Sequence, residues 1–147
     1  MRNNLFLYIL VAALQFSCLH DKTVKDVIIK PPLEYNFNFL GYDININNPE
    51  KDRRCYYKIF IDKIEVGRST IGLESQKKFF ESNIQSNRHL LMVEKWVLDE
   101  KMGKYVKLNN IEQPKPNYKY FDLPEDKYVK ITLEHDVLIN KSVFILE

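Results

Sequence analysis

This 147-residue chain has few cysteines, glycines and prolines, and almost no excess of charge of either sign. Two cysteines cannot build a disulfide-rich scaffold, and four glycines with six prolines are too few for a fibrous or low-complexity chain. A formal net charge of +2 lacks the basic excess typical of nucleic-acid-binding proteins. With 45% apolar and 13% aromatic residues, the sequence instead predicts one packed domain that binds no nucleic acid.

Motifs for catalysis and ligand binding are scarce as well. No His-Glu-x-x-His, Cys-x-x-Cys, phosphate-loop or Gly-x-Ser-x-Gly pattern occurs in the chain. The three histidines, His20, His89 and His135, are too widely spaced to indicate a metal site. We therefore predict no enzyme activity, no cofactor and no metal.

Two carboxylates lie in and just after a long apolar run, Glu94 and Asp99. A pair of carboxylates can serve glycoside hydrolysis, and this is the one arrangement in the chain that would support an enzyme. We favour the simpler interpretation, in which they lie at a solvated edge and form ion pairs with Lys95 and Lys101.

The N-terminal segment has the pattern of a secretory signal. Residues 1–4 are polar and basic, and an apolar run interrupted only by Gln15 follows over residues 5–16. A membrane-spanning helix needs about 20 apolar residues, so this run is too short to cross a bilayer. We predict a cleaved signal peptide over residues 1–17.

The end of this signal, Leu14-Gln15-Phe16-Ser17-Cys18, resembles the lipobox of bacterial lipoproteins. In that family a small residue precedes a cysteine that receives a diacylglycerol, and Ser17 and Cys18 match these positions. Gln15 stands where an aliphatic residue is usual, so the match is to the relaxed form. The resemblance implies that Cys18 is lipidated and anchors the protein to a membrane. Two or three acyl chains bind a membrane stably, whereas a single chain binds it only weakly. Leu19 replaces the aspartate of inner-membrane retention, which favours the outer membrane.

Two alternatives stay open for the cysteines. Cleavage at Val11-Ala12-Ala13 by an ordinary signal peptidase would leave Cys18 free to form a disulfide with Cys55 in an oxidising compartment. If Cys18 is lipidated, Cys55 is a lone thiol, and we expect a small buried apolar residue beside Tyr56 and Tyr57.

The lipidated cysteine and a polar tether are predicted over residues 18–33. This stretch has mixed charges and contains Pro31-Pro32, which favours an extended spacer ahead of the domain, residues 34–147. The alternative is that Val27-Ile28-Ile29 is already a first strand, because three β-branched residues favour one.

From residue 34 onward the apolar residues follow a period of two, which is typical of β-strands. The phase shifts from odd to even positions across Leu40-Gly41, which predicts a turn or bulge there. The apolar run over residues 89–98 predicts a central strand, and the last two strands are expected to form a hairpin about His135-Asp136. Residues 73–82 suit either a helix or a strand.

The pattern predicts seven to nine short strands, with the prolines and glycines in loops, turns or bulges. We predict an all-β fold, an antiparallel β-sandwich of immunoglobulin or transthyretin type. Ile61-Asp62-Lys63-Ile64-Glu65-Val66-Gly67-Arg68-Ser69-Thr70, followed by Asn87-Arg88-His89-Leu90-Leu91-Met92-Val93, resembles the core of PEGA-type and related bacterial surface β-modules, with Lys63 and Asn87 in place of the usual glycines. That resemblance implies an extracytoplasmic structural or adhesive unit.

Tyrosine is abundant, with nine residues in the chain. Tyr118, Tyr120 and Phe121 could form an exposed aromatic patch for a protein or a glycan, because such side chains are enriched at interfaces. The alternative is that they pack in the core with their hydroxyls at its rim. We take these three residues and Trp96 as the candidate binding residues.

Together these observations predict a lipid-anchored cell-envelope protein that acts as a structural or protein-binding module, facing the periplasm or the cell surface. In length and layout the chain resembles small sandwich lipoproteins of the type VI secretion membrane complex, which implies a protein partner in a secretion system. The alternative function is a surface lipoprotein that binds a glycan or small ligand through the aromatic patch.

Overall fold

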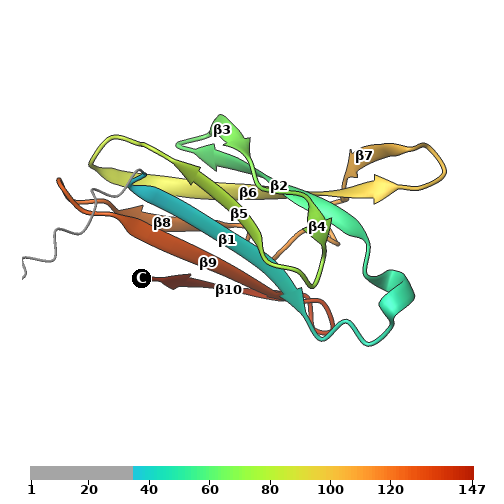
Figure 1. Ribbon diagram of the computed structural model, residues 1–147. Helices are drawn as coiled ribbons and strands as arrows, with labels where there is room; N and C mark the ends of the chain where they lie inside the picture. The colour runs from blue at the N-terminus through green and yellow to red at the C-terminus, as the bar shows by residue number, and fades with distance from the viewer. Residues whose placement is uncertain (1–34) are drawn as a thin grey trace, which may run out of the picture. The chain divides into compact units, whose positions relative to one another are not determined.

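Ten β-strands and one short 3-10 helix make up the regular structure of residues 35–147, the part of the chain that the computed structural model describes (Figure 1). In chain order they are β1 (Phe37–Ile44), η1 (Pro49–Lys51), β2 (Arg54–Ile61), β3 (Ile64–Arg68), β4 (Gly72–Leu73), β5 (Lys78–Ser82), β6 (Arg88–Asp99), β7 (Lys104–Lys107), β8 (Tyr118–Asp122), β9 (Val129–Asp136) and β10 (Lys141–Leu146). The predicted signal peptide, the lipidation site Cys18, the tether and the alternative strand Val27-Ile28-Ile29 lie outside the described residues. Nothing within residues 35–147 forms a helix of the length and apolarity needed to cross a membrane.

The strands form two sheets. The four-stranded sheet has the order β10-β9-β1-β5, and the six-stranded sheet has the order β3-β2-β6-β7, with β4 paired to β2 and β8 paired to β6. The predicted all-β class is confirmed, with ten strands in the described part instead of seven to nine. One pairing departs from the antiparallel expectation, because β1 and β9 run parallel.

The larger of two apolar clusters in the described residues lies between the sheets. Each strand that faces it alternates buried and more exposed residues, as the period-two pattern predicts. The buried residues of this core are Phe37, Phe39, Tyr57, Ile59, Ile61, Leu91, Val93, Phe121, Leu123, Val129, Ile131 and Leu133. Since they come from both sheets, the two layers face each other as in a sandwich.

Strand β1 is continuous, so the turn or bulge predicted at Leu40-Gly41 is wrong. Gly41 and Asp43 are buried and stand at inward positions that an apolar residue normally fills, and this created the apparent phase shift. A Cβ on Gly41 would lie 2.7 Å from a ring carbon of Tyr57, so glycine is required by close packing here.

Gly72 lies in strand β4, so the prediction that the glycines lie in loops, turns or bulges is wrong there too. The long apolar run and the C-terminal hairpin are confirmed, the hairpin with a shifted turn. Strand β6 lies in the centre of its sheet, as the long apolar run predicts. Strands β9 and β10 form the expected hairpin, but its turn occupies residues 137–140 instead of His135-Asp136. The segment that suited either a helix or a strand contains β5.

Candidate functional site

The outward side of the six-stranded sheet is apolar. Along β6 the inward residues from His89 to Val97 are buried, and the residues between them point outward. An antiparallel sheet with one solvated face normally carries polar residues at such positions. The outward residues of β6 are instead Leu90, Met92, Glu94, Trp96 and Leu98.

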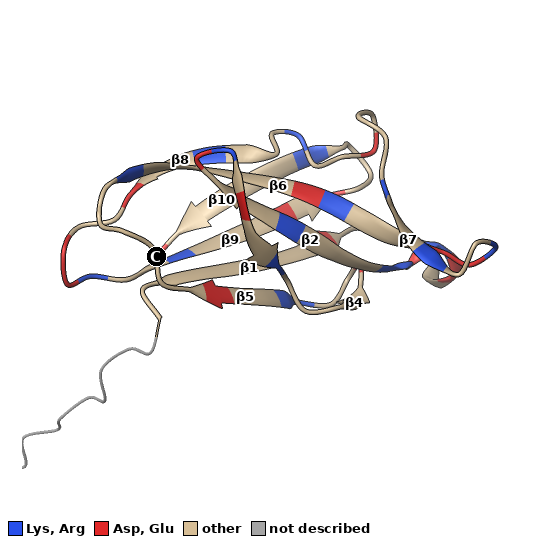
Figure 2. Cartoon of the chain, turned by 90° about the horizontal axis from the view of Figure 1, so that it is seen from above, with Lys and Arg blue, Asp and Glu red and all other residues tan. Residues whose placement is uncertain are grey.

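Neighbouring strands extend this apolar surface. The pairing places Tyr56 beside Trp96 and Tyr105 beside Leu98, and it places Tyr118 and Tyr120 beside Met92 and Leu90. We use the term aromatic face for Tyr56, Phe60, Leu90, Met92, Trp96, Leu98, Tyr105, Tyr118 and Tyr120. In Figure 2, which views the molecule from above, charged residues form short bands on β2 and β6 with uncharged stretches between them.

The rings of the aromatic face contact one another in two groups. Tyr56 stacks on Trp96 with centroids 6.2 Å apart, and Tyr105 meets Tyr56 edge-on at 5.1 Å. Tyr118 and Tyr120 form a T-shaped pair at 6.5 Å. Both distances and angles are those that aromatic pairs prefer, so the rings are held in place before any partner binds.

Cations lie over these rings. The Lys58 Nζ is 4.8 Å from the Trp96 ring centroid, Arg68 lies 5.7 Å from Tyr56, and Arg88 lies 5.5 Å from Tyr120. Such contacts favour an aromatic surface with a basic character, suited to a partner that offers carboxylates or carbonyl oxygens. The buried Nε1 of Trp96 has no hydrogen-bond acceptor among the described residues.

The sequence-predicted binding residues divide between the surface and the core. Tyr118 and Tyr120 are exposed, at 51% and 54%, and Trp96 lies partly buried on the same face. Phe121 is 2% exposed and belongs to the core, so it cannot form part of an exposed patch. Alternation along β8 explains this, because Phe121 has the opposite parity to Tyr118 and Tyr120.

A cluster of buried charges fills one part of the space between the sheets. Lys95 Nζ contacts the carboxylates of Asp43 and Glu74, the latter at 2.7 Å. The hydroxyl of Tyr57 donates to Asp43 at 3.0 Å, and Arg53 pairs with Glu74 at 3.0 Å. We use the term buried charge cluster for these five residues, in which two cations face two carboxylates; four of the residues are buried, and the Arg53 side chain is 40% exposed.

This cluster corrects the predicted role of Lys95. Lys95 points inward, and Glu94 on the outward side pairs with Lys107 at 2.5 Å. Asp99 likewise forms no ion pair with Lys101; its carboxylate accepts backbone N–H bonds at the start of the following turn, each 3.0 Å long. Glu94 and Asp99 therefore serve separate structural contacts and are not brought together as a pair.

Protonation states in the cluster follow from its pairing. Burial alone would lower the pKa of Lys95, but the Asp43 and Glu74 carboxylates raise it above the usual value. Burial would raise the pKa of Glu74, but Lys95 and Arg53 lower it. Lys95 and Glu74 are therefore both charged at neutral pH and form an ion pair.

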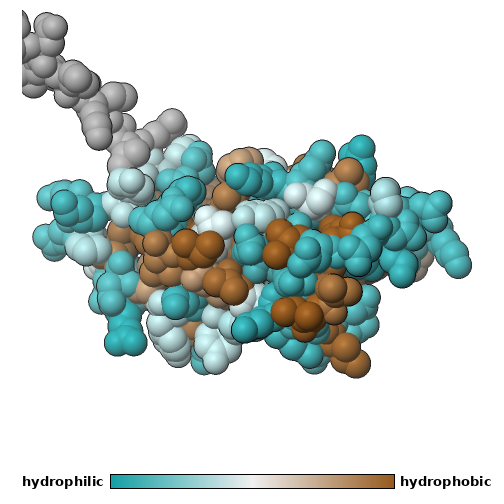
Figure 3. Space-filling view, turned by 90° about the horizontal axis from the view of Figure 1, so that it is seen from below, coloured by the Kyte–Doolittle hydropathy of each residue, from teal (hydrophilic) through white to brown (hydrophobic). Residues whose placement is uncertain are grey.

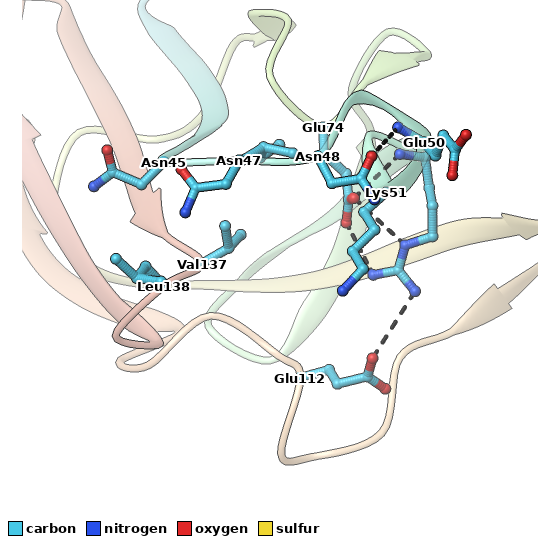
Figure 4. A pocket seen from close by; sticks show the side chains of 11 residues that line it. Asn45, Asn47, Asn48, Glu50, Lys51, Glu74, Glu112, Val137 and Leu138 are labelled. Atoms are coloured by element: carbon cyan, nitrogen blue, oxygen red, sulfur yellow. Dashed lines mark hydrogen bonds and ion pairs between the residues drawn. The ribbon is translucent and has the colours of Figure 1, made fainter.

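A pocket of about 520 Å³ opens beside the cluster (Figure 4). Glu74 and Arg53 contribute to its wall, and the guanidinium of Arg53 lies 3.9 Å from Glu112 on the other side. Val137 and Leu138 form an apolar part of the lining. Because Arg53 and Glu74 already satisfy each other, this pocket offers less to a ligand than the aromatic face does.

The two histidines of the described residues have structural partners. His89 lies 2.7 Å from Asp62, and His135 lies 3.0 Å from the hydroxyl of Ser142. Cys55 is a fully buried free thiol, and burial raises its pKa to about 11. Residues 35–147 contain no group of three or more histidine, cysteine, aspartate or glutamate side chains placed to bind a metal ion.

Comparison with family models, with curated proteins and with solved structures finds no match for this chain.

Proposed function

We propose that this protein is a lipid-anchored module of the bacterial cell envelope, whose β-domain of immunoglobulin or transthyretin type binds a protein partner through the aromatic face. The N-terminal Cys18 carries the lipid, and the domain faces the periplasm or the cell surface from the outer membrane. The resemblance in length and layout to type VI secretion lipoproteins makes a secretion-system membrane complex the proposed setting.

The aromatic face is the observation that supports a binding role. Nine apolar or aromatic residues lie on the solvent side of one sheet, and two of them, Tyr118 and Tyr120, are exposed. Exposed aromatic side chains gathered on one face are typical of an interaction site. Tyrosine, tryptophan and arginine are the residues most enriched where binding energy concentrates. Ring pairs spread over several strands, with cations above them, suit a protein surface better than a small molecule.

A crosslinking experiment in intact cells tests the binding role. A photoreactive phenylalanine analogue at position 120 should give one discrete heavier band, and Tyr118→Ala in the same chain should reduce that band at least about tenfold, because central aromatic side chains each contribute about 2 kcal/mol. Tyr128 is the matched control, since it is also a tyrosine with 51% exposure but lies outside the aromatic face. Equal bands from positions 120 and 128, or none, would contradict the proposal.

Metabolic labelling tests the lipid anchor separately. Cells fed a fatty-acid analogue should label the wild-type chain and the Cys55→Ala variant equally, while Cys18→Ala should lose the label and leave the membrane fraction. Cys55 is a suitable control because it is the buried thiol of the folded domain. A labelled Cys18→Ala chain, or one that stays with the membranes, would refute the anchor and leave the binding face untouched.

A glycan or small-ligand binder is the second candidate, favoured by the exposed Tyr118–Tyr120 ring pair. An aromatic ring offers the same low-entropy surface to a sugar ring as to a protein. Here Tyr120→Ala should abolish retention of the purified chain on immobilised cell-wall polysaccharide, and Tyr128→Ala should not. If neither Tyr120→Ala nor Tyr128→Ala changes retention, glycan binding through this ring pair is excluded.

A further inference from the structure

The free edge of the four-stranded sheet lies at β10, on a different sheet from the aromatic face. Val143, Ile145 and Leu146 on this strand are 49%, 43% and 42% exposed. The adjoining turn adds Val137, Leu138 and Ile139, at 36%, 66% and 64%. Figure 3, which views the molecule from below, shows hydrophobic groups gathered in patches on that side.

Some backbone hydrogen-bonding groups along this edge of β10 have no partner within residues 35–147. Glu147 and Lys130 exchange two backbone hydrogen bonds of 2.9 and 3.0 Å, so Ile145 and Val143, which have the same parity, also bond to β9. Ser142, Phe144 and Leu146 therefore turn their N–H and C=O groups away from β9. The carbonyl of Lys115 accepts the N–H of Ser142 at 2.7 Å, while Phe144 and Leu146 lie beyond this contact.

Natural proteins protect such edges with charges, prolines or covering loops. At the opposite edge of the same sheet, the backbone N–H and C=O of Phe79 on β5 bind Thr70 at 3.0 and 2.8 Å. Residues 143–146 of β10 contain no charge and no proline. The β10 edge thus resembles a strand that is covered by another strand in the working protein.

We propose that the occupant is the β10 strand of a second copy of this chain, paired antiparallel about a two-fold axis at Ile145. In this register Phe144 of one copy and Leu146 of the other exchange both backbone hydrogen bonds, which gives four new bonds across the axis. Two four-stranded sheets then become one continuous sheet of eight strands. The interface is isologous, as in most soluble homodimers.

Charge complementarity favours this self-pairing. Lys141, Val143, Ile145 and Glu147 share the outer face of β10. Within its own chain the Glu147 carboxylate pairs with Lys130. In the proposed register Glu147 of the second copy also lies opposite Val143 and diagonal to Lys141, within reach of a long side chain. Lys115, whose carbonyl covers Ser142, brings a second exposed cation to the same end. The two like-charged ends are thereby kept apart, and Ile145 meets its own copy at the centre.

Sedimentation equilibrium of the purified full chain tests the proposal. The wild type should form a dimer, and Ile145→Lys should raise the dimer dissociation constant at least about tenfold, because it places two cations face to face at the axis. The matched control is Phe79→Lys, which changes a 52% exposed residue of the same cross-strand row at the opposite edge and should leave the dimer intact. Leu146→Pro should also give a monomer that keeps the β-rich circular dichroism spectrum of the folded domain, because its N–H faces away from β9.

Disulfide trapping tests the register. In a Cys18→Ala background, Ile145→Cys should form a covalent dimer readily, since non-hydrogen-bonded antiparallel neighbours have Cα atoms about 4.5 Å apart. Val143→Cys should not crosslink to itself in this register. A chain that is monomeric at 200 μM, a dimer that resists both Ile145→Lys and Leu146→Pro, or stronger trapping at position 143 than at 145 would each overturn the proposal. The aromatic face is unchanged in all these variants, so the result does not depend on the function proposed above.

Discussion

Replacing Lys95 by methionine tests the energetic role of the buried charge cluster. Lys95 is 1% exposed and bridges Asp43 and Glu74, whose side chains are 0% and 4% exposed. Methionine keeps the length of the side chain but leaves both carboxylates without this cation. Breaking one partner of a buried ion pair costs about 3–5 kcal/mol, which is a large part of the roughly 5–15 kcal/mol that stabilises a typical domain.

Urea unfolding followed by Trp96 fluorescence measures this loss. We expect Lys95→Met to lower the free energy of unfolding by about 3–5 kcal/mol, and addition of Asp43→Asn to restore part of it, because one unpaired charge is removed. Lys107→Met is the control, since its ion pair with Glu94 is solvent-exposed and should contribute about 0–1 kcal/mol. A Lys95→Met domain within 1 kcal/mol of the wild type would refute the reasoning.

Three further predictions concern packing and pH. Gly41→Ala should destabilise the domain by about 1–3 kcal/mol in thermal or urea unfolding, because the new Cβ would lie 2.7 Å from the Tyr57 ring; an unchanged midpoint would show that the ring moves freely. Burial lowers the pKa of His135 in the folded domain. The contribution of this residue to stability is therefore complete above the unfolded pKa near 6.5 and is lost as the pH falls below that value. Urea midpoints measured from pH 5 to 8 should show this slope, and His135→Gln should flatten it. Burial would lower the pKa of His89, but Asp62 raises it overall. This pair therefore stabilises the folded domain at low pH, and the contribution is lost as the pH rises through the folded pKa. Asp62→Asn should cost more stability at pH 5 than at pH 9, and equal losses would contradict this.

The period of two was enough to predict strands, because it follows from the geometry of the strand itself. It was not enough to predict the buried charge cluster, because a pattern of apolar residues assigns charged residues to the solvent side. The predicted phase shift across Leu40-Gly41 puts the odd-numbered Asp43 on the solvent side and interrupts strand β1, which the structure shows to be continuous. Lys95 has the same parity as Val93 and Val97, and that signal in the sequence would have placed it inside.

The candidate binding residues show the same limit of local patterns. Composition indicated an aromatic surface around Tyr118 and Tyr120, and alternation along β8 would have excluded Phe121. The full aromatic face could not be predicted from the sequence, because it depends on which strands lie side by side. Tyr56 and Trp96 are 40 positions apart in the sequence and meet only through the pairing of β2 with β6.

The parallel pairing of β1 with β9 limits how early the four-stranded sheet can form during synthesis. Phe37 of β1 lies beside Val129 of β9, so β1 can form this pairing only after the ribosome has added 92 further residues. At ordinary translation speeds of about 5–20 residues per second, that interval is roughly 5–20 s. Contacts so distant along the chain also form slowly once both segments exist. Until β9 is synthesised, the edge of β1 that pairs with it stays open, and the four-stranded sheet cannot be completed.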